Sequence, residues 1–179
     1  MDFALSAEAQ AIFDLAHDLG QTEIAPHARD WEAAGTIPKS LWPKLAALGF
    51  GGLYVSADKG GSGLSRLEAS LVFQALSHAC PSVAAFLSIH NMCAKMIELY
   101  GSDRLQARFL PRALSMECFF SYCLTEPGSG SDAAALRTRA DRTPQGYALT
   151  GTKAFISGGG YSDAYLVMCR TGGDGPKGI

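Results

Sequence analysis

The first part of the chain carries hydrophobic residues at helical spacing. Apolar side chains three or four positions apart follow a candidate N-cap, Ser6: Ile12, Leu15, Ala16 and Leu19. This pattern predicts an amphipathic helix, and Pro26 is expected to kink or end it because proline cannot donate a helical hydrogen bond.

The same spacing predicts four more helices. They cover residues 38–48, 66–80, 82–100 and 103–111. Pro38 suits the first turn of the earliest one, and Gly101 ends the longest. Ser65 and Glu68 have the spacing of a capping box, while the glycine-rich stretch 51–65 is typical of a loop.

From residue 118 the pattern changes to short segments rich in aromatic and β-branched residues. Strands are predicted within residues 118–124, 146–157 and 163–171. The last two flank a turn at Gly158–Gly160, which favours antiparallel pairing. The predicted fold class is therefore α+β, with an all-α domain over residues 1–117 and the start of an antiparallel β domain over residues 118–179.

About three strands are fewer than an antiparallel sheet of this kind usually has. We therefore expect the 179 residues to be part of a longer protein. The alternative is a small α+β protein that ends in a flexible loop.

Composition and charge exclude several function classes. Hydrophobic residues make up 47% of the chain, and 15 basic against 17 acidic residues give a net charge of −2. This balance and the lack of a basic run give no attraction for nucleic acid or anionic membranes. No apolar stretch is long enough to span a bilayer, and the start shows no secretory signal, so a cytoplasmic location is expected.

Cysteine and histidine show no metal-binding or redox spacing. The five cysteines form no CxxC pair and the four histidines no HExxH pattern, so no metal site is predicted. An odd number of cysteines in apolar segments favours reduced, buried thiols. Cys123 is interpreted as a packing residue rather than a nucleophile.

The segment "SYCLTEPGSGSD", residues 121–132, is unusually poor in large side chains after Pro127. Its GSGSDA hexapeptide satisfies a relaxed dinucleotide fingerprint, but the following "SDAAALRTRA" is too short for a crossover helix and no acid lies near Gly151. We reject a Rossmann unit on these grounds. Two readings stay open: a bare backbone that lets a planar cofactor or phosphate reach main-chain amides, and an ordinary Pro-Gly turn.

A longer pattern distinguishes these readings. "YCLTEPGSGSD" followed by "GTKAFISGG" resembles the flavin-binding signature of the acyl-CoA dehydrogenase family. The resemblance covers essentially the whole chain. Residues 49–69, 88–111 and 167–179 are similar to the branch of the family that acts on isobutyryl-CoA.

The resemblance implies FAD as cofactor, a short and branched acyl-CoA as substrate, electron-transfer flavoprotein as electron acceptor and a homotetramer for the full-length protein. Carried over by position, nine residues would contact FAD: Tyr122, Cys123, Leu124, Thr125, Gly130, Ser131, Phe155, Ile156 and Ser157. Ser131 would also touch the CoA portion of the substrate. Many relatives have Trp and Thr where this chain has Phe155 and Ser157, but Phe keeps a stacking face and Ser keeps the hydroxyl.

Three residues of the predicted 82–100 helix match positions that contact the acyl chain in relatives: Ala85, Ser88 and Met92. Core packing predicts the same spacing, so both interpretations stay open. Glu126 is interpreted as a structural or surface carboxylate, because the family's bases come from later in the chain. No catalytic residue is therefore predicted here, and the chain alone is expected to lack dehydrogenase activity. A related flavin-dependent monooxygenase and a non-catalytic helical interaction module are the alternative functions.

Overall fold

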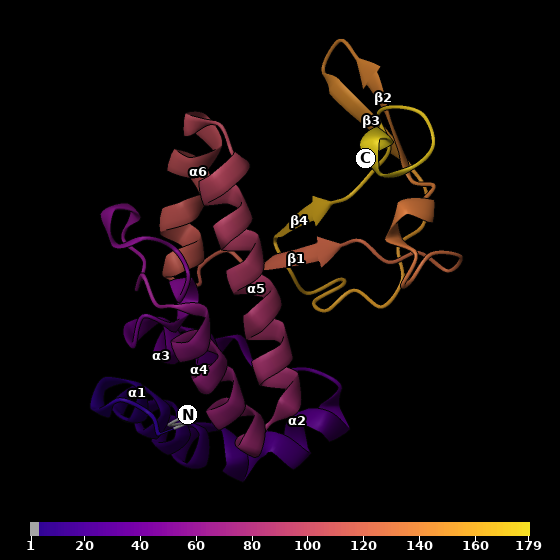
Figure 1. Cartoon of the computed structure of the whole chain (residues 1–179). Helices are drawn as coiled ribbons and strands as arrows, with labels where there is room; N and C mark the ends of the chain where they lie inside the picture. Colours follow the sequence, from indigo (N-terminus) through magenta and orange to yellow (C-terminus); the bar gives the residue numbers. More distant parts are fainter. Residues whose placement is uncertain (1–3) are drawn as a thin grey trace. The chain divides into compact units, whose positions relative to one another are not determined.

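The structure is a computed structural model that describes residues 4–179. The chain divides into two compact units, Met1–Cys118 and Phe119–Ile179, which are drawn in Figure 1. The first unit contains all the α-helices and the second contains all the β-strands that the described residues form. The predicted α+β fold class, helical first and β second, is confirmed.

Residues 4–118 of the helical unit form six α-helices. They are α1 (Ala7–Leu19), α2 (Ala28–Ala34), α3 (Trp42–Ala47), α4 (Arg66–Ala79), α5 (Pro81–Tyr100) and α6 (Asp103–Leu114). Helix α1 packs against α4, α4 against α5, and α5 against α6. The longest helix, α5, therefore supports two neighbours and carries much of the buried apolar surface.

Local signals set most helix ends where the sequence predicts them. The Ser6 hydroxyl accepts a hydrogen bond from the Ala9 amide at the start of α1. Ser65 and Glu68 form both halves of the capping box at the start of α4. Beyond α1, a π-helical turn and a 3₁₀ turn that contains Pro26 lead into α2, which ends at Gly35 with φ 65°.

The predicted helix over residues 38–48 is shorter than expected. Pro38 is extended, with ψ 137°, and precedes a 3₁₀ turn, Lys39–Leu41. Pro43 instead occupies the first turn of α3, where its missing N–H has no helical acceptor to lose. The sequence offers two prolines for one helix start, and the second one is used.

The loop over residues 51–65 is fastened to α5 by a buried asparagine. The Asn91 side chain accepts a hydrogen bond from the Leu53 amide at 2.6 Å and donates one to the Phe50 carbonyl at 2.8 Å. About two turns farther along α5, the Glu98 carboxylate accepts a hydrogen bond from the Ser56 hydroxyl. These bonds satisfy loop backbone that the glycine-rich sequence leaves without regular structure.

The second unit contains four short strands in two pairs. They are β1 (Phe120–Cys123), β2 (Arg139–Thr143), β3 (Gly146–Thr150) and β4 (Ala164–Val167). Strands β2 and β3 form an antiparallel hairpin, as the orange ribbon in Figure 1 shows. Strands β1 and β4 pair in parallel, with Phe120 opposite Ala164 and Cys123 opposite Val167.

The antiparallel pairing predicted between residues 146–157 and 163–171 is thus wrong. Strand β3 pairs with β2 instead, and β4 pairs in parallel with β1. The connection over residues 124–163 is long enough to return the chain to the start of β1, so that both strands run the same way. Strand β2 was not predicted, because its "RADRT" sequence is polar and only Ala140 is buried. The predicted strand over residues 146–157 ends at Thr150.

Gly151 marks the point where the chain leaves the hairpin. A Cβ at this position would lie 2.3 Å from the Thr138 hydroxyl oxygen and 2.7 Å from its Cα. Only a residue without a side chain allows this approach. The glycine therefore directs residues 152–157 away from the strand and toward the segment that follows β1.

Candidate functional site

The two segments predicted to bind a cofactor are joined directly to each other. The Ala154 amide donates to the Thr125 carbonyl at 2.9 Å. Close to the other ends of the segments, the Ser121 hydroxyl donates to the Ser157 carbonyl at 2.6 Å. The structure thus brings Tyr122–Thr125 and Phe155–Ser157, which lie about thirty positions apart in the sequence, into one surface.

Several hydrogen-bond donors of this surface are left without a partner inside the protein. Within residues 4–179, neither the Thr125 amide nor the hydroxyls of Thr125, Ser131 and Ser157 make a hydrogen bond. Thr125 is half-buried, and its amide is held in place because the Leu124 and Thr125 carbonyls on either side of it both accept hydrogen bonds, from Lys153 and Ala154. Fixed and unpaired donors of this kind are suited to the polar edge of a ligand.

Phe155 is the most unusual residue of the surface. Its ring is 95% exposed, and its backbone has a φ of 55°, in the left-handed region. This conformation costs a non-glycine residue about 1–3 kcal/mol and persists only where the neighbouring structure imposes it. The Ala154 and Ser157 hydrogen bonds do so on either side, and the result is a flat apolar face presented outward.

A tight turn connects this surface to Gly130 and Ser131. Glu126 and Ser129 exchange two backbone hydrogen bonds, of 2.9 and 3.1 Å, and the Ser129 hydroxyl donates to the Asp132 carbonyl. The start of the "GSGSD" segment therefore lies in a turn, which agrees with the predicted Pro-Gly turn. Its exposed Gly130 and Ser131 also fit the other reading, in which bare backbone meets a ligand.

Of the two roles predicted for Glu126, a structural or a surface carboxylate, its buried surroundings support the structural one. One oxygen accepts from the Arg137 amide at 2.7 Å, and the other from the Thr138 amide at 2.8 Å and from the Lys153 ammonium at 2.9 Å. Burial acts to raise the pKa of Glu126, but the hydrogen bonds from Thr138, Lys153 and Arg137 outweigh it and lower the pKa to about 2. The carboxylate is therefore ionised and fully engaged.

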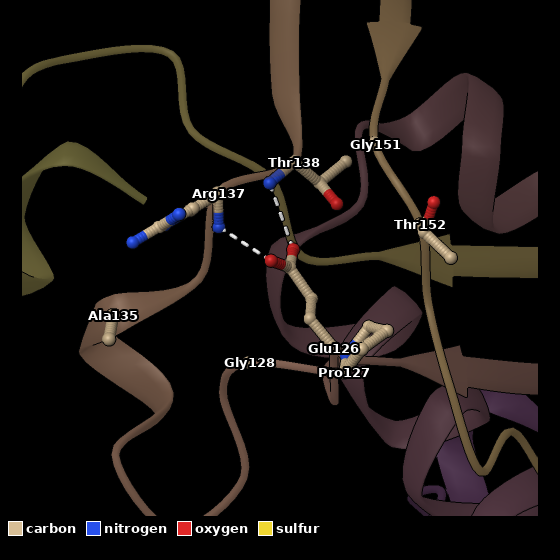
Figure 2. A pocket seen from close by; sticks show the side chains of 8 residues that line it. All are labelled: Glu126, Pro127, Gly128, Ala135, Arg137, Thr138, Gly151 and Thr152. Carbon is tan, nitrogen blue, oxygen red and sulfur yellow. Dashed lines mark hydrogen bonds between the residues drawn. The ribbon is translucent and has the colours of Figure 1, made fainter.

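A pocket of about 290 Å³ lies beside this carboxylate but is not the predicted cofactor surface. Figure 2 shows Arg137 and Ala135 on one side of Glu126, with Gly151 and Thr152 on the other. Pro127, Gly128 and Thr138 complete its lining, and the buried Thr138 hydroxyl has no partner among the described residues. None of the nine predicted cofactor residues lines this pocket.

Sequence reasoning missed Lys153, which connects the two segments. Its ammonium donates to the Leu124 carbonyl at 2.8 Å as well as to Glu126. A single lysine between a glycine and an apolar run has no periodic pattern that would identify it. The one available indication was its place inside "GTKAFISGG".

The predicted acyl-contact residues lie on a different unit. Ala85 is exposed on α5, and Ser88 and Met92 are half-buried. The fully buried face of α5 is formed by other residues, among them Leu87, Cys93 and Ala94, but the half-buried Ser88 and Met92 still pack in part within the helical unit, so both interpretations stay open. Their contact with an acyl chain stays a prediction.

The cysteines are free, and four of the five are buried. Burial raises the pKa of the Cys123 thiol, although Lys153 acts in the opposite direction, so this thiol stays protonated near neutral pH. Across residues 4–179, no cluster of three or more histidine, cysteine or acidic side chains is arranged to hold a metal ion. None of the helices described is both long and apolar enough to cross a membrane.

Family models match both units. Residues 6–117 match the acyl-CoA dehydrogenase N-terminal domain, and residues 121–179 match the acyl-CoA dehydrogenase middle domain. The chain belongs to the acyl-CoA dehydrogenase family. Among curated relatives of this family, the mitochondrial isobutyryl-CoA dehydrogenases of Bos taurus and Dictyostelium discoideum are each 51% identical to it over 98% of its length.

Solved acyl-CoA dehydrogenase structures have the same fold. A probable acyl-CoA dehydrogenase from Mycobacterium abscessus superimposes with a TM-score of 0.89 at 35% identity, over 97% of this chain and 46% of that one. Butyryl-CoA dehydrogenase from Megasphaera elsdenii superimposes with a TM-score of 0.85 at 34% identity, over 99% of this chain and 47% of that one. The present chain spans 42% of the length of the two isobutyryl-CoA dehydrogenases, so it corresponds to less than half of these relatives.

Proposed function

We propose that this chain supplies a flavin-binding part of an acyl-CoA dehydrogenase that oxidises a short, branched acyl-CoA and passes the electrons to electron-transfer flavoprotein. The observation that carries the proposal is the surface made by Tyr122–Thr125 and Phe155–Ser157. It combines an exposed aromatic face with fixed, unpaired donors, which is what a planar and polar-edged ring system needs. The likeness to isobutyryl-CoA dehydrogenases supports the substrate class.

The residues of this surface fit FAD. The Thr125 amide and hydroxyl would bond the polar edge of the flavin, and Phe155 would cover its ring with the Ser157 hydroxyl beside it. Gly130 and Ser131 would let the rest of the cofactor and the CoA portion of the substrate approach the backbone. FAD, when bound, supplies the acceptor for the hydride that leaves the β carbon of the acyl group.

Glu126 does not act as the base in this proposal. Its carboxylate has a pKa of about 2 and is surrounded by donors, so it is a poor proton acceptor near neutral pH. We therefore propose that the base that removes the α proton comes from a part of the protein other than these residues. The acyl group would lie against α5 at Ala85, Ser88 and Met92. Homotetramer formation and a cytoplasmic location stay predictions from the sequence.

The flavin-binding claim is testable on the chain itself with a matched pair of variants. Phe155→Ala should weaken FAD binding about tenfold, the loss expected for one stacking face. Tyr147→Ala removes an aromatic ring that is 61% exposed on β3, outside the proposed surface, and should leave binding unchanged. Quenching of flavin fluorescence gives both dissociation constants. Equal affinity for the wild type and Phe155→Ala would contradict the proposal.

A further inference from the structure

The peptide between Leu124 and Thr125 is held from one side only. Its carbonyl, on Leu124, accepts a hydrogen bond of 2.8 Å from the Lys153 ammonium. In a trans peptide the N–H points opposite to the C=O, so the Thr125 amide points away from Lys153. That amide makes no hydrogen bond within the described part of the chain. The direction of an unpaired donor is thus set by the lysine behind it.

Lys153 is itself held in place. Its ammonium forms an ion pair with Glu126 at 2.9 Å, and the two side chains are only 12% and 7% exposed. Glu126 is fixed in turn by the amides of Arg137 and Thr138. The ammonium therefore has two acceptors at fixed positions and little freedom to turn elsewhere, unlike a lysine in a solvent-exposed pair.

The neighbouring peptide is fixed by a separate bond. The Thr125 carbonyl accepts from the Ala154 amide at 2.9 Å, and Ala154 directly follows Lys153. The backbone of the 153–157 segment and the side chain of its first residue thus hold consecutive carbonyls of the 122–125 segment. Loss of the lysine would leave the Leu124–Thr125 peptide free to rotate while the second bond still joins the segments.

We propose that Lys153 is a positioning residue for the ligand site: by holding the Leu124 carbonyl it directs the Thr125 N–H toward the bound flavin, and Glu126 keeps the ammonium in position for this task. The inference rests on the proposed function, since the flavin is the group that receives the N–H. It goes beyond that function because it assigns the donor's direction to a residue that touches no ligand.

A purely structural role for Lys153 predicts a different pattern of results. In that case a replacement would lower stability but leave the affinity of the folded protein for FAD unchanged. A positioning role predicts weaker binding by protein that is still folded. It also predicts that arginine at position 153 restores FAD affinity, because arginine keeps the charge and can donate to both acceptors.

The test uses the whole 179-residue chain in four forms: wild type, Lys153→Met, Lys153→Arg and Lys177→Met. Lys177 is exposed in the same unit and serves as the matched control. FAD affinity is measured by flavin fluorescence, and the Thr125 amide is followed by ¹⁵N NMR without ligand. Lys153→Met should shift the Thr125 amide signal and raise the FAD dissociation constant about tenfold, the loss of one charge-assisted hydrogen bond. The FAD dissociation constant of Lys153→Arg should stay within about threefold of the wild-type value, and that of Lys177→Met should equal the wild-type value.

Each outcome bears on one proposal or the other. Folded Lys153→Met that binds FAD as tightly as wild type overturns the positioning role and leaves the proposed function standing. If the wild type binds no FAD, the proposed function fails, and the claim that the N–H is directed toward a flavin fails with it. An unchanged Thr125 signal in folded Lys153→Met would separately overturn the claim that Lys153 sets the direction of this N–H. If Lys153→Met does not fold, Lys153→Gln takes its place with the opposite expectation: it can still donate to the Leu124 carbonyl, so it should bind FAD within about threefold of wild type, and a roughly tenfold loss of affinity in folded protein would overturn the positioning role.

Discussion

At the residue scale, the proposed ligand surface depends on which polar groups are bonded inside the protein and which are left unbonded. Inside the second unit, the polar groups of Glu126 and Lys153 bind each other, and the Thr138 hydroxyl is buried. The hydroxyls of Thr125 and Ser157, by contrast, make no hydrogen bond within residues 4–179 and can bond a ligand. The resemblance to acyl-CoA dehydrogenases predicts the outward residues by position. It does not predict the inward ones, because their partners are carbonyls and amides that no sequence pattern marks.

Glu126 should make the second unit sensitive to acid. Its pKa is about 2 in the folded chain against an ordinary 4.5, so the unfolded state binds the proton more readily. The stabilisation that the ionised Glu126 carboxylate gives to the folded second unit is therefore complete above about pH 4.5 and is lost as the pH falls toward 2. Glu126→Gln should remove this pH dependence and cost about 3 kcal/mol at neutral pH, since it leaves Lys153 buried without a counter-charge.

Hydrogen exchange of the amides in residues 119–179, followed against pH, measures this effect in the right unit. Asp174→Asn, which changes an exposed acid of the same unit, is the control and should behave like wild type. Glu126→Gln that retains the wild-type acid dependence would show that another carboxylate is responsible.

At the element scale, what could be predicted depends on how local its cause is. The capping box of α4 and the Gly35 end of α2 follow from residues three or four positions apart. The parallel pairing of β1 and β4 depends on a partner that lies beyond a connection of residues 124–163, and nothing within either strand specifies it. The polar strand β2 escapes prediction because it lacks apolar alternation and relies on β3 for its ladder.

The contact between α5 and α6 should respond to pH through His90. The ring is fully buried, with Nε2 3.0 Å from the Ala113 carbonyl of α6. Burial lowers the pKa of His90 to about 4, although backbone groups of Ala113 and Gly51 act in the opposite direction. The unfolded chain, with an ordinary value of 6.5, therefore binds more protons between pH 4 and 6.5.

The free energy of unfolding of the helical unit should thus rise with pH across this range, by up to about 3 kcal/mol, and stay level above it. His90→Gln, which can still donate to the Ala113 carbonyl, should abolish the rise. Urea unfolding followed by helical circular dichroism reports on this unit, because it holds every α-helix found in residues 4–179. His27→Gln, at an exposed ring, is the control, and a His90→Gln variant with an unchanged pH profile would refute the assignment.

At the scale of the whole molecule, the chain joins a helical unit to a β unit and matches two successive domains of acyl-CoA dehydrogenases. The proposed flavin surface lies in the second unit and the predicted acyl contacts lie in the first. Because Glu126 is engaged and ionised, with a pKa of about 2, it is not suited to accept the α proton.

We therefore expect the isolated chain to show no measurable dehydrogenation of isobutyryl-CoA, even where it binds FAD. An assay with a dye as electron acceptor measures this directly, and a full-length acyl-CoA dehydrogenase is the positive control. Turnover by the chain comparable to that control would mean that a base has been overlooked among these residues.

The central claim is that residues 122–131 and 155–157 form one surface for a flavin. The most direct measurement is an NMR titration of the ¹⁵N-labelled chain with FAD. The account predicts shifts concentrated on the amides of Thr125, Gly130, Ser131 and Phe155–Ser157, while the hairpin of β2 and β3 stays unchanged. Shifts confined to the hairpin or to the pocket beside Arg137, with the Thr125 and Phe155 amides unmoved, would contradict it.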